Sequence, residues 1–109
     1  MRFAVEITEG AEADLKAIHR FMCEVRGADD VDVLLDRLIE KIKLLEEFPL
    51  RGNVPKELDG LGINDVRQTL LYPHRLIYRV LGSTVYILVI ADGRRDFQAL
   101  LERRILGRL

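Results

Sequence analysis

The chain has 109 residues, the length of one ordinary domain, and its 49% hydrophobic and 32% charged residues are typical of a globular protein. The single cysteine, Cys23, excludes an internal disulfide and fits a reducing compartment. The first ten residues lack the apolar stretch of a signal peptide, and no apolar run approaches the roughly 20 residues that span a bilayer. We therefore expect one domain over residues 1–109, located in the cytoplasm and without membrane contact.

The formal net charge of −1 conceals an asymmetry between the two parts of the chain. Residues 1–66 carry 9 Lys and Arg against 15 Asp and Glu, whereas residues 67–109 carry 8 Arg, no Lys and 3 Asp and Glu. A basic C-terminal part favours a site for an anion, either nucleic acid or an acidic partner, because Arg binds phosphate and carboxylate in a bidentate manner. The alternative is that these arginines only solvate the surface of strands.

The N-terminal segment predicts a strand and then a helix. Residues 2–7 alternate between apolar and polar, which favours a strand, and Thr8 can cap the helix that follows. Spacings of four and three residues align one apolar stripe along this helix: Ala11, Leu15, Ile18, Met22 and Val25.

A second helix follows the break at Gly27 and Ala28, with Asp29 or Asp30 as its expected cap and Pro49 as its end. Its stripe repeats the spacing of the first helix and is widened by three further apolar residues: Val31, Leu35, Leu38, Ile42 and Leu45, with Leu34, Ile39 and Phe48. Two matched stripes joined by a short link predict an antiparallel helical hairpin.

Residues 49–64, rich in Pro and Gly, predict a loop, after which strands are expected at about residues 66–72, 74–81 and 84–91. Gly82 and Ser83 favour a two-residue hairpin of type II′ between the last two strands. The last strand is apolar on both faces, so we expect it to be central. Asp96 is the expected cap of a final helix, whose inward residues are Phe97, Leu100, Leu101 and Ile105.

The predicted order is therefore β-α-α-β-β-β-α, an α+β fold in which the helical hairpin packs on one face of a mainly antiparallel sheet. We expect the other face of the sheet to be partly free.

Four short motifs in this order resemble the RelE/ParE superfamily of bacterial type II toxins, also known as plasmid stabilisation toxins, over essentially the whole chain. They are Phe48-Pro49-Leu50-Arg51-Gly52, Asp65-Val66-Arg67, the run from His74 to Val80, and the run from Val89 to Asp96. The resemblance implies a compact, growth-inhibiting toxin that a cognate antitoxin neutralises.

The resemblance leaves the cellular target open, because a shared fold does not fix the activity. ParE-like members inhibit DNA gyrase, which requires no catalytic residues, and we favour this interpretation. RelE-like members are ribosome-dependent endoribonucleases that cut mRNA without a metal. A third alternative is a degenerate toxin that only binds its antitoxin.

The arginines of the C-terminal part form the candidate site. Arg75 and Arg79 share one face of their strand, because every second residue of a strand points the same way. Together with Arg67 on the preceding strand and with Arg94 and Arg95 at the last turn, they predict a cradle for an anion over the open face of the sheet. We assign Arg67, Arg79 and Arg94 to target binding.

By resemblance, Arg75 and Arg95 match the arginines that RelE-like nucleases place at the scissile phosphate. Those nucleases also carry a terminal-helix tyrosine where this chain has Leu101, and lysines where it has Val66, Arg67 and Gln68. Arginine is a poor proton acceptor, so His74 is the one nearby candidate base, although strand alternation places it opposite Arg75. The candidate catalytic residues are therefore Arg75, Arg95 and His74.

We expect replacement of both Arg75 and Arg95 by Ala to remove toxicity at a cost in stability within about 1 kcal/mol per site, because both are predicted on strand surface or turn. Two histidines and one cysteine lack the spacing of metal ligands, so we expect neither a metal nor another cofactor.

Overall fold

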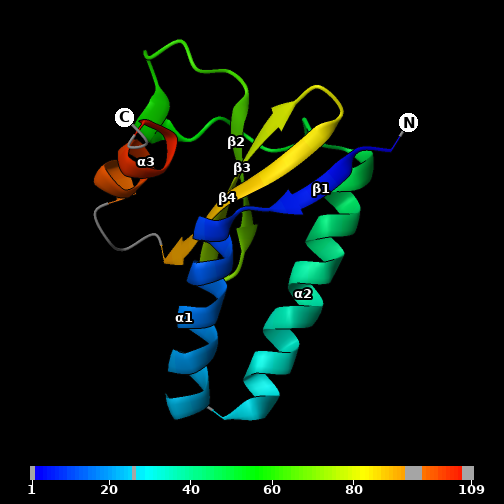
Figure 1. Ribbon diagram of the computed structural model, residues 1–109, viewed down its shortest axis with the longest axis vertical. Coiled ribbons are helices and arrows are strands. Elements are labelled where there is room, and N and C mark those ends of the chain that lie inside the picture. Colours follow the sequence, from blue (N-terminus) through cyan, green and yellow to red (C-terminus); the bar gives the residue numbers. More distant parts are fainter. Residues whose placement is uncertain (1, 26, 93–96, 107–109) are drawn as a thin grey trace.

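The computed structural model describes residues 2–25, 27–92 and 97–106. Along the chain lie strand β1 (Ala4–Ile7), helices α1 (Glu9–Val25) and α2 (Ala28–Glu47), the short 3-10 helix η1 (Lys56–Leu58), strands β2 (Val66–Leu71), β3 (His74–Leu81) and β4 (Thr84–Asp92), and helix α3 (Phe97–Leu106). The predicted element order is confirmed (Figure 1).

The four strands form one mixed sheet in the order β1-β4-β3-β2. β1 pairs with β4 in parallel, whereas β2 with β3 and β3 with β4 pair antiparallel. β4 is central, as its apolar character predicted, and β1 and β2 are the two edges of the sheet.

Helices α1 and α2 form the predicted hairpin on one face of the sheet, and their far ends extend past it (Figure 1). The first core joins the hairpin to strand residues that include Tyr78 and Ile87. Four residues of the predicted α2 stripe or its flank are buried: Val31, Leu34, Leu38 and Leu45.

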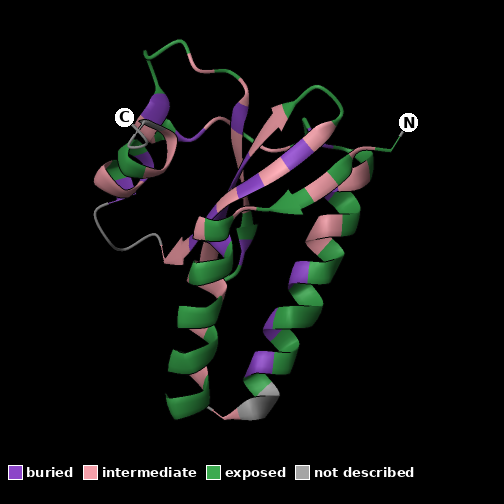
Figure 2. Ribbon diagram, in the orientation of Figure 1, coloured by how far each residue is buried: buried purple, intermediate pink, exposed green. Residues whose placement is uncertain are grey.

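Other members of the predicted stripes are exposed, namely Val25, Leu35, Ile39 and Phe48, so the buried stripes are narrower than predicted. Val25 ends α1 where the hairpin extends past the sheet, and the ribbon of α1 there is largely exposed (Figure 2). Phe48 instead caps the C-terminal end of α2, which lies beside β1. The elements that pack against α2 are α1, β1 and β2.

α3 and η1 cover part of the opposite face of the sheet. A second core forms there from Leu58 of η1, from Phe97 and Leu101 of α3, and from Val66, Ile77 and Val89 of the strands. The expected inward residues of the last helix are thereby confirmed, with Leu100 and Ile105 packed at the margin of this core.

The N-terminal cap of α1 agrees with the prediction from the sequence, whereas that of α2 does not. The Ala11 N–H donates to Thr8 Oγ1 at 3.3 Å, so the predicted cap of α1 is confirmed. α2 instead begins at Ala28 behind Gly27, whose φ of 92° lies in the left-handed region that glycine tolerates. The expectation that Asp29 or Asp30 caps α2 is therefore wrong, since both lie within the helix.

The hairpin between β3 and β4 turns at Gly82 and Ser83, where Leu81 pairs with Thr84. Gly82 has a φ of 60° and, among the described residues, no residue other than glycine has a positive φ. A positive φ at the first turn residue alone is the signature of the predicted type II′ turn. None of the described helices is long and apolar enough to cross a membrane.

Candidate functional site

Arg75 lies on β3, on the sheet face that carries α3, and its guanidinium is held on three sides. Its Nη1 and Nη2 donate to the two carboxylate oxygens of Glu57 at 2.8 and 2.9 Å. Its Nε donates to Gln68 Oε1 at 2.9 Å, and Nη2 donates to the same oxygen. Only 15% of the Arg75 side chain and 10% of the Glu57 side chain are exposed.

The ring of Phe97 covers one face of this guanidinium, with Arg75 Cζ 3.9 Å from the ring centroid. Such cation–π contacts strengthen when the pair is shielded from water. The bound Arg75 lowers the pKa of the Glu57 carboxyl below its ordinary value of 4.5, against the opposing effect of burial. Arg75 therefore ties η1, β2 and the first turn of α3 together.

Arg79 lies on the same sheet face as Arg75, as the strand alternation predicted, but at the opposite end of β3. It pairs with Val66 and Tyr86, whereas Arg75 pairs with Leu70 and Ala91. Its Nε lies 3.0 Å from Asp65 Oδ2, and the two side chains are 27% and 42% exposed. The two arginines thus share a face without converging on one point.

Arg67 lies on the other face of the sheet, so the predicted cradle does not include it. It is paired directly with Tyr78, which belongs to the core beneath the helical hairpin. Cross-strand partners point to the same face, which separates Arg67 from Arg75. Which residue of β2 faces which residue of β3 depends on the register between them, and the sequence of one strand does not specify it.

Arg67 and Tyr78 hold the loop after α2 at Gly52. Arg67 Nη1 donates to the Gly52 carbonyl at 2.8 Å, and the Gly52 N–H donates to the Tyr78 hydroxyl at 3.1 Å. Burial raises the pKa of Tyr78 above 10, although its bond from Gly52 and the charge of Arg67 act in the opposite direction. The Tyr78 hydroxyl therefore stays protonated at neutral pH.

We expect Gly52→Ala to lower the free energy of unfolding by more than about 2 kcal/mol, because a methyl group would overlap two fixed atoms. These are the Gln68 carbonyl oxygen and the Tyr78 hydroxyl oxygen. The matched control is Gly60→Ala, where a methyl group meets open space and only the φ of 80° is unfavourable, at roughly 1–2 kcal/mol. Urea denaturation compares the two, and equal losses would show that the space at Gly52 is not restricted.

His74 begins β3, where it pairs with Leu71 and Asp92 on the two neighbouring strands. Since Leu71 belongs to the core beneath the helical hairpin, the pairing places His74 on that face, opposite Arg75. Its Nδ1 is buried, with no hydrogen-bond partner among the described residues. His74 is thus separated by the sheet from the arginine that it would have to assist.

Burial lowers the pKa of His74 below 6.5, and the charge of Asp92 offsets only part of this effect. The unfolded chain therefore takes up a proton at a higher pH than the folded chain, so stability rises with pH across that interval. We expect the free energy of unfolding to fall as the pH drops below about 6.5, and to fall less steeply in His74→Gln. Urea denaturation from pH 7 to pH 5 measures both slopes, and parallel slopes would exclude His74 as the cause.

The remaining predicted site residues, Arg94 and Arg95, lie outside the described residues, as does Asp96. Leu101, at the position where RelE-like nucleases carry a tyrosine, is fully buried in the second core. Within the described parts of the chain, no group of three or more His, Cys, Asp or Glu residues is placed to bind a metal ion.

The described geometry supports a structural role for Arg75 better than phosphate binding, because its donors are already engaged. Glu57 and Gln68 engage these donors, and neither was predicted as a site residue from the sequence. Glu57 lies in a loop 18 residues before Arg75, and only the position of η1 against β2 brings them together. Gln68 is two residues before Leu70, the β2 partner of Arg75, and so lies on the same face. Its contact with Arg75 could be predicted only once the register between β2 and β3 was known.

The sequence of this chain matches a known protein family and a known relative. The family model described as ParE toxin of type II toxin–antitoxin system, parDE, matches residues 5–97. Toxin ParE3 of Caulobacter vibrioides is 31% identical over 98 residues, which cover 89% of this chain and 93% of that relative.

Solved structures share the fold. The chromosomal ParDE system of P. aeruginosa superimposes with a TM-score of 0.66 at 24% identity, covering 84% of this chain and 96% of the other. E. coli toxin RelE, in a mutant form in the free state, gives a TM-score of 0.60 at 16% identity, covering 100% and 99%. The family match extends from residue 5, within β1, to Phe97, the first residue of α3, so that it includes the Arg75 ion pair with Glu57 but not Leu101 of the second core. The chain therefore belongs to the ParE toxin family of type II toxin–antitoxin systems.

Proposed function

We propose that this toxin inhibits growth by binding DNA gyrase in the cytoplasm, and that residues 1–109 act as one toxin domain. Membership of the family implies an antitoxin partner that neutralises it. A gyrase inhibitor of this kind needs a binding surface and no catalytic residues, which agrees with the composition of the described site.

The observation that carries the proposal is the closed environment of Arg75. A nuclease needs free cations at the scissile phosphate and a base within reach of the attacking hydroxyl. Here Glu57 and Gln68 bind the guanidinium of Arg75, and Phe97 covers it. A phosphate would have to displace a carboxylate that makes two charge-assisted bonds, and His74 lies on the other side of the sheet.

Two assays with the purified chain test this proposal. We expect the chain to inhibit supercoiling of relaxed plasmid by gyrase, and to leave mRNA intact on programmed ribosomes. In cells, its expression should induce the DNA-damage response before protein synthesis falls. Cut mRNA with unaffected gyrase would support the RelE-like alternative, and inactivity in both assays would support a degenerate toxin.

We expect His74→Gln to keep full toxicity, because a gyrase-binding toxin does not use the imidazole as a base. A nuclease that relied on this group would lose roughly 10²–10⁴-fold in rate. Growth inhibition after induction of the wild-type and variant genes measures the difference, with thermal melting of both proteins as the control for folding. Loss of toxicity in a folded variant would argue against the gyrase proposal.

A further inference from the structure

Three cationic side chains lie around the start of the loop after α2, and within the described ranges none of them is paired with a carboxylate. Lys41 Nζ lies 3.4 Å from the Thr69 hydroxyl. Arg67 Nη1 donates to the Gly52 carbonyl, and its Nε is buried without a hydrogen-bond partner in the described part of the chain. Arg51 directly precedes Gly52 and adds the third charge. Four other described arginines, by contrast, each bind a carboxylate: Arg2, Arg75, Arg79 and Arg104.

A pocket of about 580 Å³ lies beside these cations, between α2, β2 and the loop after α2. Lys41 and Arg51 line it directly, and so does Gly52, the residue that Arg67 binds. Among its described lining residues there is no carboxylate, although the whole chain has a net charge of −1. Small-molecule sites occupy roughly 300–1,000 Å³, and a cleft lined by charges of one sign concentrates ligands of the opposite sign. The pocket therefore has the size and the charge of a site for a small anion.

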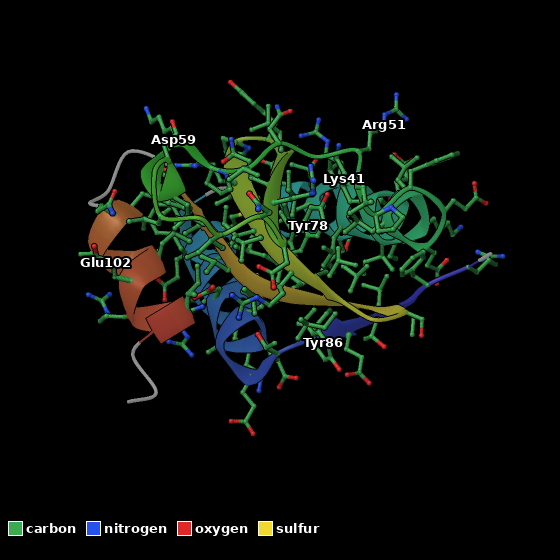
Figure 3. All side chains as sticks on the ribbon, turned by 90° about the horizontal axis from the view of Figure 1, so that it is seen from above. Lys41, Arg51, Asp59, Tyr78, Tyr86 and Glu102 are labelled. Atoms are coloured by element: carbon green, nitrogen blue, oxygen red, sulfur yellow. The ribbon has the colours of Figure 1, made fainter. Side chains whose placement is uncertain are left out.

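The wall of the pocket at the loop is held in place by the protein itself. The Gly52 carbonyl accepts a hydrogen bond from Arg67, and the Gly52 N–H donates to the Tyr78 hydroxyl. Lys41, Arg51 and Tyr78 all line this pocket, and Figure 3 shows them on one side of the molecule. Since the ordering of a loop reduces affinity, a loop that is already held in place favours binding.

The same pocket has an apolar side, which an inorganic anion would leave in water. Leu44 and Phe48 line it from α2 and are 42% and 51% exposed, and Leu70 lines it from β2 and is 60% exposed. A nucleobase has a flat face that stacks on an aromatic ring, whichever base it is. Its edge can exchange hydrogen bonds with the amide of Asn53, which also lines the pocket. A ligand that joins a phosphate to a base therefore matches both sides of the pocket.

We propose that this pocket binds a nucleoside phosphate as a free small molecule. Its phosphate lies between Lys41 and Arg51, and its base stacks on Phe48. Arg67 adds positive potential from behind Gly52 without touching the ligand. The inference does not rest on the proposed target, because it uses neither gyrase nor the residues packed under α3.

The ligand comparison uses the full chain with four ligands: AMP, adenosine, inorganic phosphate and a single-stranded octamer of deoxyadenosine. We expect AMP to shift the amide NMR signals of residues 41–53 and 68–70. Adenosine, which lacks the charge, and inorganic phosphate, which lacks the base, should each bind at least about tenfold more weakly than AMP. The octamer should bind no more tightly than AMP, because the pocket holds one nucleotide.

Three variants separate the contributions of the phosphate and the base. Lys41→Gln with Arg51→Gln should weaken AMP binding at least about tenfold. The matched control, Lys43→Gln with Lys56→Gln, removes the same charge at two exposed lysines outside the pocket and should change AMP binding less than about twofold. Phe48→Leu keeps an apolar side chain but removes the ring, so AMP should bind at least about fivefold more weakly, whereas binding of inorganic phosphate should not change.

The proposal is overturned if AMP does not bind, if its shifts fall outside the pocket, or if the two double variants weaken its binding equally. Equal binding of AMP and inorganic phosphate would exclude a contact with the base, and tighter binding of the octamer would exclude a free nucleotide as the ligand. The ligand comparison uses only the unaltered chain, so it decides the matter even if a variant fails to fold.

Discussion

Arg75→Ala is expected to lower the free energy of unfolding by about 3 kcal/mol or more, and not by the 1 kcal/mol that a surface arginine would cost. The substitution leaves the Glu57 carboxylate, only 10% exposed, without its cation. Removing one partner of a buried ion pair is costly because the other charge stays desolvated. The Phe97 ring also loses the guanidinium that covers it.

The matched control is Arg79→Ala, on the same strand and the same face. Its pair with Asp65 is more exposed, so we expect a loss of about 1 kcal/mol or less. A double variant, Arg75→Met with Glu57→Leu, removes both charges and should recover most of the stability lost in Arg75→Ala. Chemical denaturation of the four proteins gives these differences, and equal losses for the two single variants would contradict the buried ion pair.

The pH dependence gives an independent check on the same pair. Because Arg75 lowers the pKa of Glu57 below 4.5, the contribution of the pair is complete above pH 4.5 and is lost as the pH falls through the pKa of the folded state. Because Arg75→Ala is expected to destabilise the fold, a toxicity assay on this variant would not separate loss of folding from loss of function. Arg95→Ala, at a residue outside the described part of the chain, is the better variant for separating loss of function from loss of folding.

Leu38→Asp is expected to unfold the protein. Leu38 is 5% exposed and packs in the core between the helical hairpin and the sheet, with Leu34, Leu45 and Leu71. The variant would lose the burial of a leucine and place a carboxylate in an apolar core, a combined cost of more than about 4 kcal/mol. Since native proteins have a total stability of only about 5–15 kcal/mol, such a loss removes a large part or all of the stability of a domain of this size.

The neighbouring Ile39→Asp is the control, because Ile39 is 51% exposed although the sequence pattern included it in the same stripe. We expect its free energy of unfolding to stay within about 0.5 kcal/mol of wild type. Far-ultraviolet circular dichroism during heating distinguishes the two variants. A cooperative transition at the wild-type temperature in Leu38→Asp would show that the hairpin does not pack through this residue.

The sequence by itself determined the order of the elements, since each has a local cause. Spacings of three and four residues specify α1 and α2, Thr8 caps the first helix, and Pro49 prevents the second from continuing. Gly82 determines the β3–β4 turn, and the continuous apolar run of residues 85–90 predicts a central strand. Four motifs in this order resemble the family, so the family was also within reach of the sequence.

Only the tertiary structure decided which side chains meet. Alternation places Arg75 and Arg79 on one face of β3, but the register between β2 and β3 turns Arg67 to the other face. A register shift in the β3–β4 pairing, where Tyr78 faces Ile87 and Ile77 faces Val89, changes which residues of β4 face each core. Glu57 reaches Arg75 because a loop folds back over the sheet, and α3 then covers the pair. These contacts join segments far apart in the chain, and no periodicity within a single segment encodes them.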